Sequence, residues 1–126
     1  MPRQVEPNLS NDDMCDLAPM ICRQRLVVEG VCSAPIGEES IRTYLSQLSD
    51  ICGMRSLMEP VTHYSERYGW AGWIHWEASG AHCYAWENPL LFFSVDVYTC
   101  KPFDRLEVVD FTARFFEAKQ VAAKAF

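Results

Sequence analysis

The stretch that decides the fold runs from Gly69 to Trp86, GWAGWIHWEASGAHCYAW, and resumes at 92–100 as FFSVDVYTC. Apolar residues alternate with small or polar ones along much of both pieces, and Ser79 and Gly80 interrupt the first piece. An alternation of period two is typical of β-strands, whose successive side chains point to opposite faces of a sheet. The pattern predicts an antiparallel meander with strands near 54–64, 69–77, 81–87 and 90–100.

A helix is predicted before the meander, because apolar residues recur there at spacings of three and four. Glu38 and Glu39 stand at its start, where the helix dipole favours acids, and Gly53 stands at its end. The predicted buried stripe consists of Ile41, Tyr44, Leu45, Leu48, Ile51 and Cys52. Ahead of this helix, the β-branched run from Arg25 to Cys32 predicts a strand.

A second helix is predicted after the meander, with Asp104 as its N-cap and its end near Ala118. Its predicted buried stripe consists of Leu106, Val109, Ala113 and Phe116. A short strand follows at 120–126. The order β, α, β, β, β, β, α, β predicts an α/β (α+β) domain, a two-layer sandwich of a mainly antiparallel sheet with two helices on one face.

Composition limits the classes of partner. The 126 residues suit one domain, and 49% of them are apolar and 22% charged. The net charge is -6 and there is no block of Lys or Arg, so we expect no nucleic-acid or membrane partner. Because the sequence has neither a bilayer-spanning apolar run nor a signal peptide, we expect a cytoplasmic protein with a small-molecule substrate.

The chain divides into two parts. Residues 1–20 have no periodicity and are predicted to be a flexible leader or docking arm, and residues 21–126 form the domain. The six cysteines are irregularly spaced without a CxxC pair, which in a cytosolic chain is typical of reduced, mostly buried thiols. The three histidines form no metal-ligand pattern, so no metal site is predicted.

The quoted stretch resembles the central signature of the prokaryotic S-adenosylmethionine decarboxylases. In that signature a Gly-x-Ser-Gly strand leads to a Glu-Ser-His processing site, then to a His-Thr-Trp-Pro-Glu strand and an Asp-Val-Phe-Thr-Cys strand. Gly69 and Gly72 match the two glycines, and Ser79 falls on the processing serine without a gap. The other matches are His63, Trp86, Asp96 and Cys100. The resemblance begins near Arg25, continues to the C-terminus and implies an S-adenosylmethionine decarboxylase-like fold.

The chain departs from this signature where the family processes itself. The positions of the processing glutamate, the following histidine, the serine of the first strand and the histidine of the later strand are taken by Ala78, Gly80, Ala71 and Tyr84. In the family, the processing serine cleaves the backbone before it and becomes a pyruvoyl group, which accepts electrons when carbon dioxide leaves the substrate. Ala71 has no polar group, and a tyrosine is a poor base near neutral pH. We therefore expect no cofactor, and a pyruvoyl from Ser79 only if the chain processes itself.

The resemblance and the strand alternation together give the candidate site. On a strand, His82 points to the same face as Tyr84, and Cys100 ends the face that carries Asp96. The predicted catalytic residues are Cys100, Ser79 and His82. The predicted substrate-binding residues are Tyr84, Trp86, Glu87, Tyr68, His63 and Asp96, where the resemblance implies ring stacking on adenine and a carboxylate for the ribose. Glu87 stands one position ahead of that carboxylate's own place, which is Asn88.

Several interpretations remain open. We expect an S-adenosylmethionine-binding enzyme of lyase type that works without a pyruvoyl group, through Cys100, Glu87 or His82. The alternatives are a self-processing pyruvoyl-dependent decarboxylase of polyamine biosynthesis with relocated processing residues, and a non-catalytic regulatory paralogue. Ser79 and His82 also fit an ordinary turn serine and a half-buried histidine. A homodimer, or a complex with a paralogue, is predicted because the free sheet face is expected to be rich in Trp and Phe.

Overall fold

The computed structural model describes residues 16–126, and within them six strands and two helices follow in the predicted order. The strands are β1 (Gln24–Val31), β2 (Val61–Ser65), β3 (Gly69–Trp76), β4 (Ser79–Trp86), β5 (Phe92–Thr99) and β6 (Gln120–Ala125). The helices are α1 (Glu38–Ile51) and α2 (Arg105–Phe115). Neither helix of this range is long and apolar enough to cross a membrane. Most of the predicted leader, residues 1–20, lies outside the described residues.

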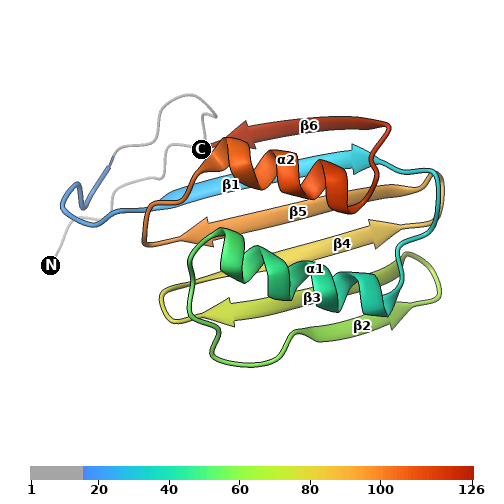
Figure 1. Ribbon diagram of the computed structural model, residues 1–126, viewed down its shortest axis with the longest axis horizontal. Helices are drawn as coiled ribbons and strands as arrows, with labels where there is room; N and C mark the ends of the chain where they lie inside the picture. The colour runs from blue at the N-terminus through green and yellow to red at the C-terminus, as the bar shows by residue number, and fades with distance from the viewer. Residues whose placement is uncertain (1–15) are drawn as a thin grey trace, which may run out of the picture.

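All six strands form one antiparallel sheet in the order β2-β3-β4-β5-β1-β6. Strands β2 to β5 are the predicted meander, and β1 and β6 extend the sheet beyond β5. Both helices lie on the same face, α1 over β3 and β4 and α2 over β1 beside β6 (Figure 1). The predicted two-layer sandwich is therefore confirmed. We call the opposite face, which neither helix covers, the open face.

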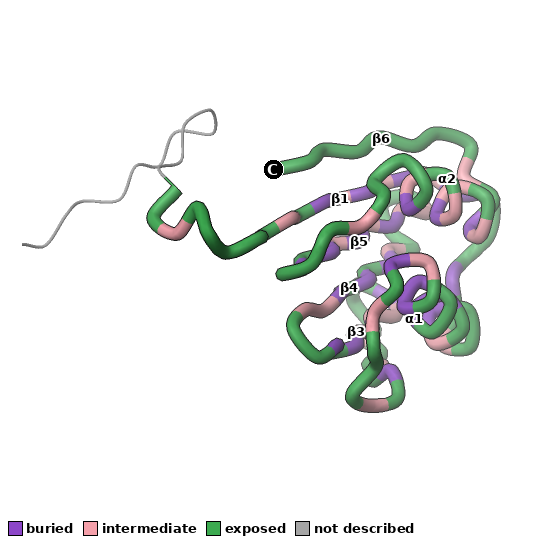
Figure 2. The backbone as a smooth tube through the Cα atoms, turned by 60° about the vertical axis from the view of Figure 1, so that its left-hand side comes forward, coloured by how far each residue is buried: buried purple, intermediate pink, exposed green. Residues whose placement is uncertain are grey.

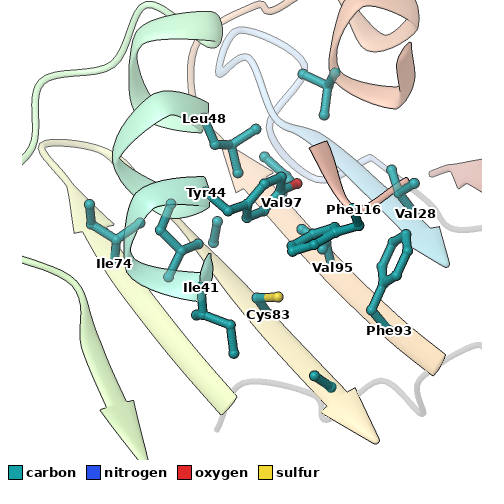
Figure 3. Close-up of a cluster of buried hydrophobic side chains, with 14 of the residues drawn as sticks. Val28, Ile41, Tyr44, Leu48, Ile74, Cys83, Phe93, Val95, Val97 and Phe116 are labelled. Carbon is teal, nitrogen blue, oxygen red and sulfur yellow. The ribbon is translucent and has the colours of Figure 1, made fainter. Parts of the chain in front are cut away.

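The core lies between the helices and the sheet. On α1 the predicted stripe faces it, and Tyr44 and Leu48 are fully buried. Figure 3 shows these two side chains meeting those of β5, such as Val95 and Val97. Burial of one such aliphatic side chain stabilises the fold by about 1.5–3 kcal/mol. Buried segments alternate along the central strands, whereas β6 is exposed along its whole length (Figure 2).

The buried stripe of α2 differs from the predicted one. Asp104 caps the helix as predicted, because its carboxylate accepts a hydrogen bond from the Glu107 backbone N–H. Val108 and Thr112 are fully buried, and of the predicted stripe Phe116 is buried, Val109 and Ala113 are partly buried and Leu106 is 81% exposed. The prediction was therefore wrong at Leu106 and missed Val108 and Thr112. The burial of Thr112 is explained by a hydrogen bond of 2.7 Å between the hydroxyls of Thr112 and Tyr44. This bond satisfies a polar side chain that hydropathy would place on the surface.

The strand predicted near 54–64 is shorter than expected. β2 begins at Val61, directly after Pro60, whose nitrogen has no hydrogen to donate to a neighbouring strand. The Arg42 guanidinium of α1 donates to the Pro60 carbonyl and to the Thr62 hydroxyl. The same hydroxyl donates to the Glu38 carboxylate at 2.9 Å. These bonds fix the start of β2 against the first turns of α1.

Gly72 lets α1 approach the sheet closely. It lies on the helix-facing side of β3, and a Cβ at this position would meet Ile41 Cγ2 at 2.5 Å. Real Cβ atoms essentially never make contacts this short, so a side chain here would push α1 away from the sheet. The glycine therefore sets the thickness of the core at this point.

The open face is less apolar than predicted. It carries Trp73, Trp86 and Phe92, but Phe93 and Trp76 point into the core and are 0% and 2% exposed. The expectation of a face rich in Trp and Phe was therefore only partly right. The charged residues of this face are Arg25, Glu29, Asp96 and Lys124.

Candidate functional site

Two hollows indent the open face, and each lies over a small residue in a row of larger ones. Residues that are paired across neighbouring strands line up in rows. The two rows are His63–Ala71–Tyr84 and His75–Gly80–Tyr98–Arg25. Because Ala71 and Gly80 fill little space or none between larger neighbours, the surface sinks at both positions.

The first hollow, the aromatic hollow, has a volume of about 220 Å³. Its lining residues are His63, Ser65, Tyr68, Gly69, Trp70, Ala71, Tyr84, Ala85 and Trp86. The rings of Tyr84 and Trp86 lie 6.2 Å apart between centroids, tilted by 40°. A hollow lined in this way suits a flat, weakly polar group that packs against rings.

Gly69 fixes the local backbone beside the aromatic hollow. Its φ is +115, and a Cβ there would lie 2.6 Å from the Ala85 carbonyl oxygen. Only glycine adopts this conformation without strain. Glu87 lies next to Gly69, because the Glu87 Cγ would be 3.7 Å from a Cβ placed on Gly69. The Glu87 backbone N–H donates to the Tyr68 carbonyl at 3.3 Å. Glu87 therefore lies beside two lining residues of this hollow, Gly69 and Tyr68, and we place it at the rim.

The second hollow, the polar hollow, has a volume of about 320 Å³. Its lining residues are Arg25, His75, Ser79, Gly80, His82, Asp96 and Tyr98. The His75 ring lies beside Gly80, which has no side chain, because the His75 Cδ2 would be 4.0 Å from a Cβ placed on Gly80. Imidazole, hydroxyl, phenol and charged groups thus share one small space. In the range 16–126, no group of three or more His, Cys, Asp or Glu side chains is placed to hold a metal ion.

Arg25 and Asp96 form a bidentate ion pair in the polar hollow. Arg25 Nε donates to Asp96 Oδ1 at 3.0 Å, and Nη2 donates to Oδ2 at 2.8 Å. The hydrogen bond to Asp96 raises the pKa of the Arg25 guanidinium further, so this side chain is a permanent cation. The Phe126 ring lies 5.0 Å from the guanidinium carbon. Asp96, predicted to bind substrate, is thus already engaged by a cation of the protein.

The two hollows are neighbours. His82 lines the polar hollow and Tyr84 lines the aromatic hollow, and they occupy successive outward positions on β4. Their rings are nearly parallel, at 8°, with centroids 6.1 Å apart. A ligand with an aromatic end and a polar end could therefore lie across this pair with one end in each hollow.

Ser79 and Cys100 meet at the edge of the polar hollow. The Ser79 hydroxyl oxygen accepts a hydrogen bond of 3.1 Å from the Cys100 backbone N–H. Cys100 follows the last residue of β5, and its side chain is exposed. The other described cysteines are Cys22, which is exposed, and Cys32, Cys52 and Cys83, which are buried.

The structure thus brings the predicted site residues together as two adjacent groups. His63, Tyr68, Tyr84 and Trp86 line the aromatic hollow, with Glu87 at its rim. Ser79, His82 and Asp96 line the polar hollow, with Cys100 beside Ser79. Arg25, His75 and Tyr98 also line the polar hollow, and they were not among the predicted site residues. Alternation places Arg25 on one face of its strand, but only the pairing of β1 with β5 shows that it meets Asp96.

Comparison with known families identifies the family to which this chain belongs. The family model described as S-adenosylmethionine decarboxylase matches residues 32–126. The chain belongs to the S-adenosylmethionine decarboxylase family. Among solved structures, the adenosylmethionine decarboxylase from Aquifex aeolicus is similar in fold, with a TM-score of 0.69 and 16% sequence identity. The similarity covers 84% of this chain and 89% of that chain. A comparison with curated proteins finds no match.

The floors of the two hollows lie at positions where this chain departs from the signature of the S-adenosylmethionine decarboxylase family. Ala71 and Gly80 stand where the family signature has a serine and a histidine. Tyr84, where the signature has its second histidine, is the direct cross-strand partner of Ala71. Three of the four departures from the signature, Ala71, Gly80 and Tyr84, therefore lie where the open face has its hollows.

Proposed function

We propose that this protein binds S-adenosylmethionine, or a related sulfonium nucleoside, on the open face and acts on it without a pyruvoyl group. The observation that carries the proposal is the adjacency of the aromatic and polar hollows, which meet at His82 and Tyr84. The ligand has one end of each kind, a flat purine and a charged amino-acid group. Membership of the S-adenosylmethionine decarboxylase family supports the same class of ligand.

In this proposal the purine lies in the aromatic hollow. Offset or tilted ring contacts with Tyr84 and Trp86 contribute about 0.5–1.5 kcal/mol each beyond the burial of apolar area. Tyr68 and His63 line the same hollow. Glu87 at the rim offers an acceptor for a ribose hydroxyl, the role that the resemblance gives to the neighbouring position.

The absence of a pyruvoyl group is proposed because the two chain neighbours of Ser79 lack the side chains that the family signature places there. Self-processing requires donors that stabilise an oxyanion and a base that removes a Cα proton. Ala78 and Gly80, which flank Ser79, have neither, and the Ser79 hydroxyl oxygen is already an acceptor for the Cys100 N–H. The proposed chemistry therefore does not pass through a pyruvoyl group.

The proposed reaction is of lyase type, at the sulfonium centre. In a lyase step, a base removes a proton from the carbon next to the one bound to sulfur, and the electrons of that carbon–hydrogen bond form a carbon–carbon double bond. The electron pair of the breaking carbon–sulfur bond passes to sulfur, which leaves as a neutral thioether. In the polar hollow, the imidazoles of His82 and His75 offer nitrogen atoms that can accept or donate a proton. The exposed Cys100 beside Ser79 offers a thiol. These side chains, with Ser79, are the proposed catalytic set.

Calorimetry with S-adenosylmethionine tests the proposal. We expect saturable binding by the full chain below millimolar concentration, and about tenfold weaker binding for Tyr84→Ala and for Trp86→Ala, because each removes one ring contact and its buried area. Leu106→Ala, on the exposed side of α2, is the control and should bind like the wild type. No binding at millimolar concentration refutes the proposal, and binding without turnover favours the regulatory paralogue.

The proposal extends to location and partners. We place the protein in the cytoplasm, without nucleic acid or membrane as a partner, and polyamine biosynthesis belongs to the alternative in which the chain is a self-processing decarboxylase. A homodimer through the open face is part of the proposal, because Trp73 and Phe92 lie on this face only partly covered. Self-association would remove both from water.

A further inference from the structure

The charged residues of the polar hollow indicate which chemical group of a ligand it binds. Arg25 is the only permanent cation among its lining residues, and Asp96 is the only acid. The bidentate bonds between them use both oxygens of Asp96. The other titratable side chains are the imidazoles of His75 and His82 and the phenol of Tyr98. Both oxygens of the single lining carboxylate are thus already paired with a cation of the protein, while donors of hydrogen bonds remain in the hollow.

Arg25 is held in place and still has donors to offer. Asp96 bonds its Nε and Nη2 groups, and the Phe126 ring lies 5.0 Å from its guanidinium carbon. Within residues 16–126, the Nη1 group donates no hydrogen bond to the protein. The side chain is 44% exposed. A guanidinium with its fork fixed on one side and two free N–H groups on the other is suited to an anion such as a carboxylate.

We propose that the polar hollow selects ligands that carry a carboxylate, with Arg25 as the residue that determines this specificity and His75, His82 and Ser79 as further donors. This inference rests on the proposed function where the carboxylate is that of S-adenosylmethionine. The α-carboxylate of the ligand lies beside Arg25, and its purine lies in the aromatic hollow.

The proposed contact has a chemical consequence. A site that binds a carboxylate by charge-assisted hydrogen bonds stabilises the ground state of that group. Loss of carbon dioxide would remove the negative charge from this position, so the stabilisation would not be kept in the transition state and would raise the barrier. The polar hollow therefore favours reactions that leave the carboxylate in place, which agrees with chemistry at the sulfonium centre.

The test compares the affinity of the full chain for S-adenosylmethionine with its affinity for the same molecule without the carboxyl group. We expect the wild type to bind the carboxylate form about tenfold more tightly, as is typical for one charge-assisted hydrogen bond. Arg25→Met should abolish this preference. Asp96→Asn should increase it, because the Arg25 fork is then free. Lys124→Met, which removes a cation of the open face outside the hollow, is the control and should keep it.

Two results would overturn the inference. The first is equal affinity of the wild type for both nucleosides, and the second is loss of binding in Asp96→Asn, which would mean that Asp96 itself holds a ligand cation. If neither nucleoside binds, the proposed function fails. The carboxylate site is then tested by titrating the protein with L-methionine and with its amide. Binding is followed through the imidazole NMR signals of His75 and His82. Saturable shifts with L-methionine that are absent with the amide and in Arg25→Met then support the carboxylate site. Equal or absent shifts refute it.

Discussion

The hydroxyl oxygen of Ser79 accepts a hydrogen bond from the backbone N–H of Cys100 at 3.1 Å, although 21 residues separate the two in the chain. The bond joins the first residue of β4 to the residue that follows β5. Both residues belong to the part of the family signature that this chain retains. The bond occupies one of the two lone pairs of the hydroxyl oxygen at the position of the family's processing serine.

The first prediction is that the purified chain remains intact. Ser79 begins β4 and pairs with Trp76 across the hairpin, and its neighbours Ala78 and Gly80 carry no acid or base. Intact-mass spectrometry should give a single species near 14.4 kDa, unchanged after days at neutral pH. The Ser79→Ala variant should give the same pattern. Two fragments produced by cleavage between Ala78 and Ser79, present in the wild type and absent in the variant, would instead support the self-processing decarboxylase.

The second prediction concerns Gly69. Alanine at this position would place a residue at φ +115 and a Cβ 2.6 Å from the Ala85 carbonyl oxygen. We expect Gly69→Ala to lower the free energy of unfolding by about 1–3 kcal/mol from backbone strain, with the clash adding to this loss. The measurement is urea denaturation followed by tryptophan fluorescence.

Gly37→Ala is the matched control for Gly69→Ala. Gly37 is the N-cap of α1 with φ -98, and a Cβ there meets nothing within 4 Å. Its substitution should cost less than about 1 kcal/mol, the usual scale for cap residues. Equal losses of stability in the two variants would contradict the role that we assign to Gly69.

The order of elements was predictable because each depends on a local pattern. Spacings of three and four marked the buried stripe of α1, and alternation marked β3 to β5. Neither pattern reports which strands pair. The polar hollow depends on Arg25 of β1 meeting Asp96 of β5, 71 residues away, and this contact follows from the sheet order.

The errors of the sequence analysis have a common physical cause, which is tertiary contact. Thr112 is buried because Tyr44 satisfies its hydroxyl, a contact that the hydropathy pattern of α2 does not show. The hollows over Ala71 and Gly80 depend on larger residues beside them on other strands. A single sequence shows that these two residues are small, but the cross-strand neighbours that make the depression are seen only in the sheet.

The third prediction concerns stability at alkaline pH. Burial raises the pKa of Cys83 from 9.0 to about 12, and burial also raises the pKa of Cys52 to about 12. A thiol whose folded-state pKa is raised keeps its proton more tightly in the folded state. Its stabilisation is therefore complete below pH 9 and is lost as pH rises towards 12. Each such thiol should add a slope of about 1.4 kcal/mol per pH unit in this window.

Cys83→Ala tests this slope directly. The variant should lose some stability at all pH values, because a buried atom is removed, but its free energy of unfolding should fall less steeply than that of the wild type between pH 9 and pH 11. Cys22→Ala removes an exposed thiol and serves as the control, with an unchanged slope. Parallel pH profiles for Cys83→Ala and the wild type would show that the buried thiol is not the source.

The last prediction concerns assembly through the open face. Trp73 lies on this face of β3, half-buried, and packs edge-on to the His75 ring at 4.9 Å. It lines neither hollow, so it is free to contact a second copy while a ligand is bound. Light scattering at micromolar concentration should give a dimer of twice 14.4 kDa. Trp73→Glu should give a monomer, because a carboxylate buried in an apolar interface without a partner is strongly unfavourable.

Leu106→Glu is the matched control, because this exposed leucine lies on α2, on the other side of the sheet, and the variant should remain a dimer. A monomeric wild type, or a dimer that persists in Trp73→Glu, would show that the open face does not bind a second copy in the proposed way.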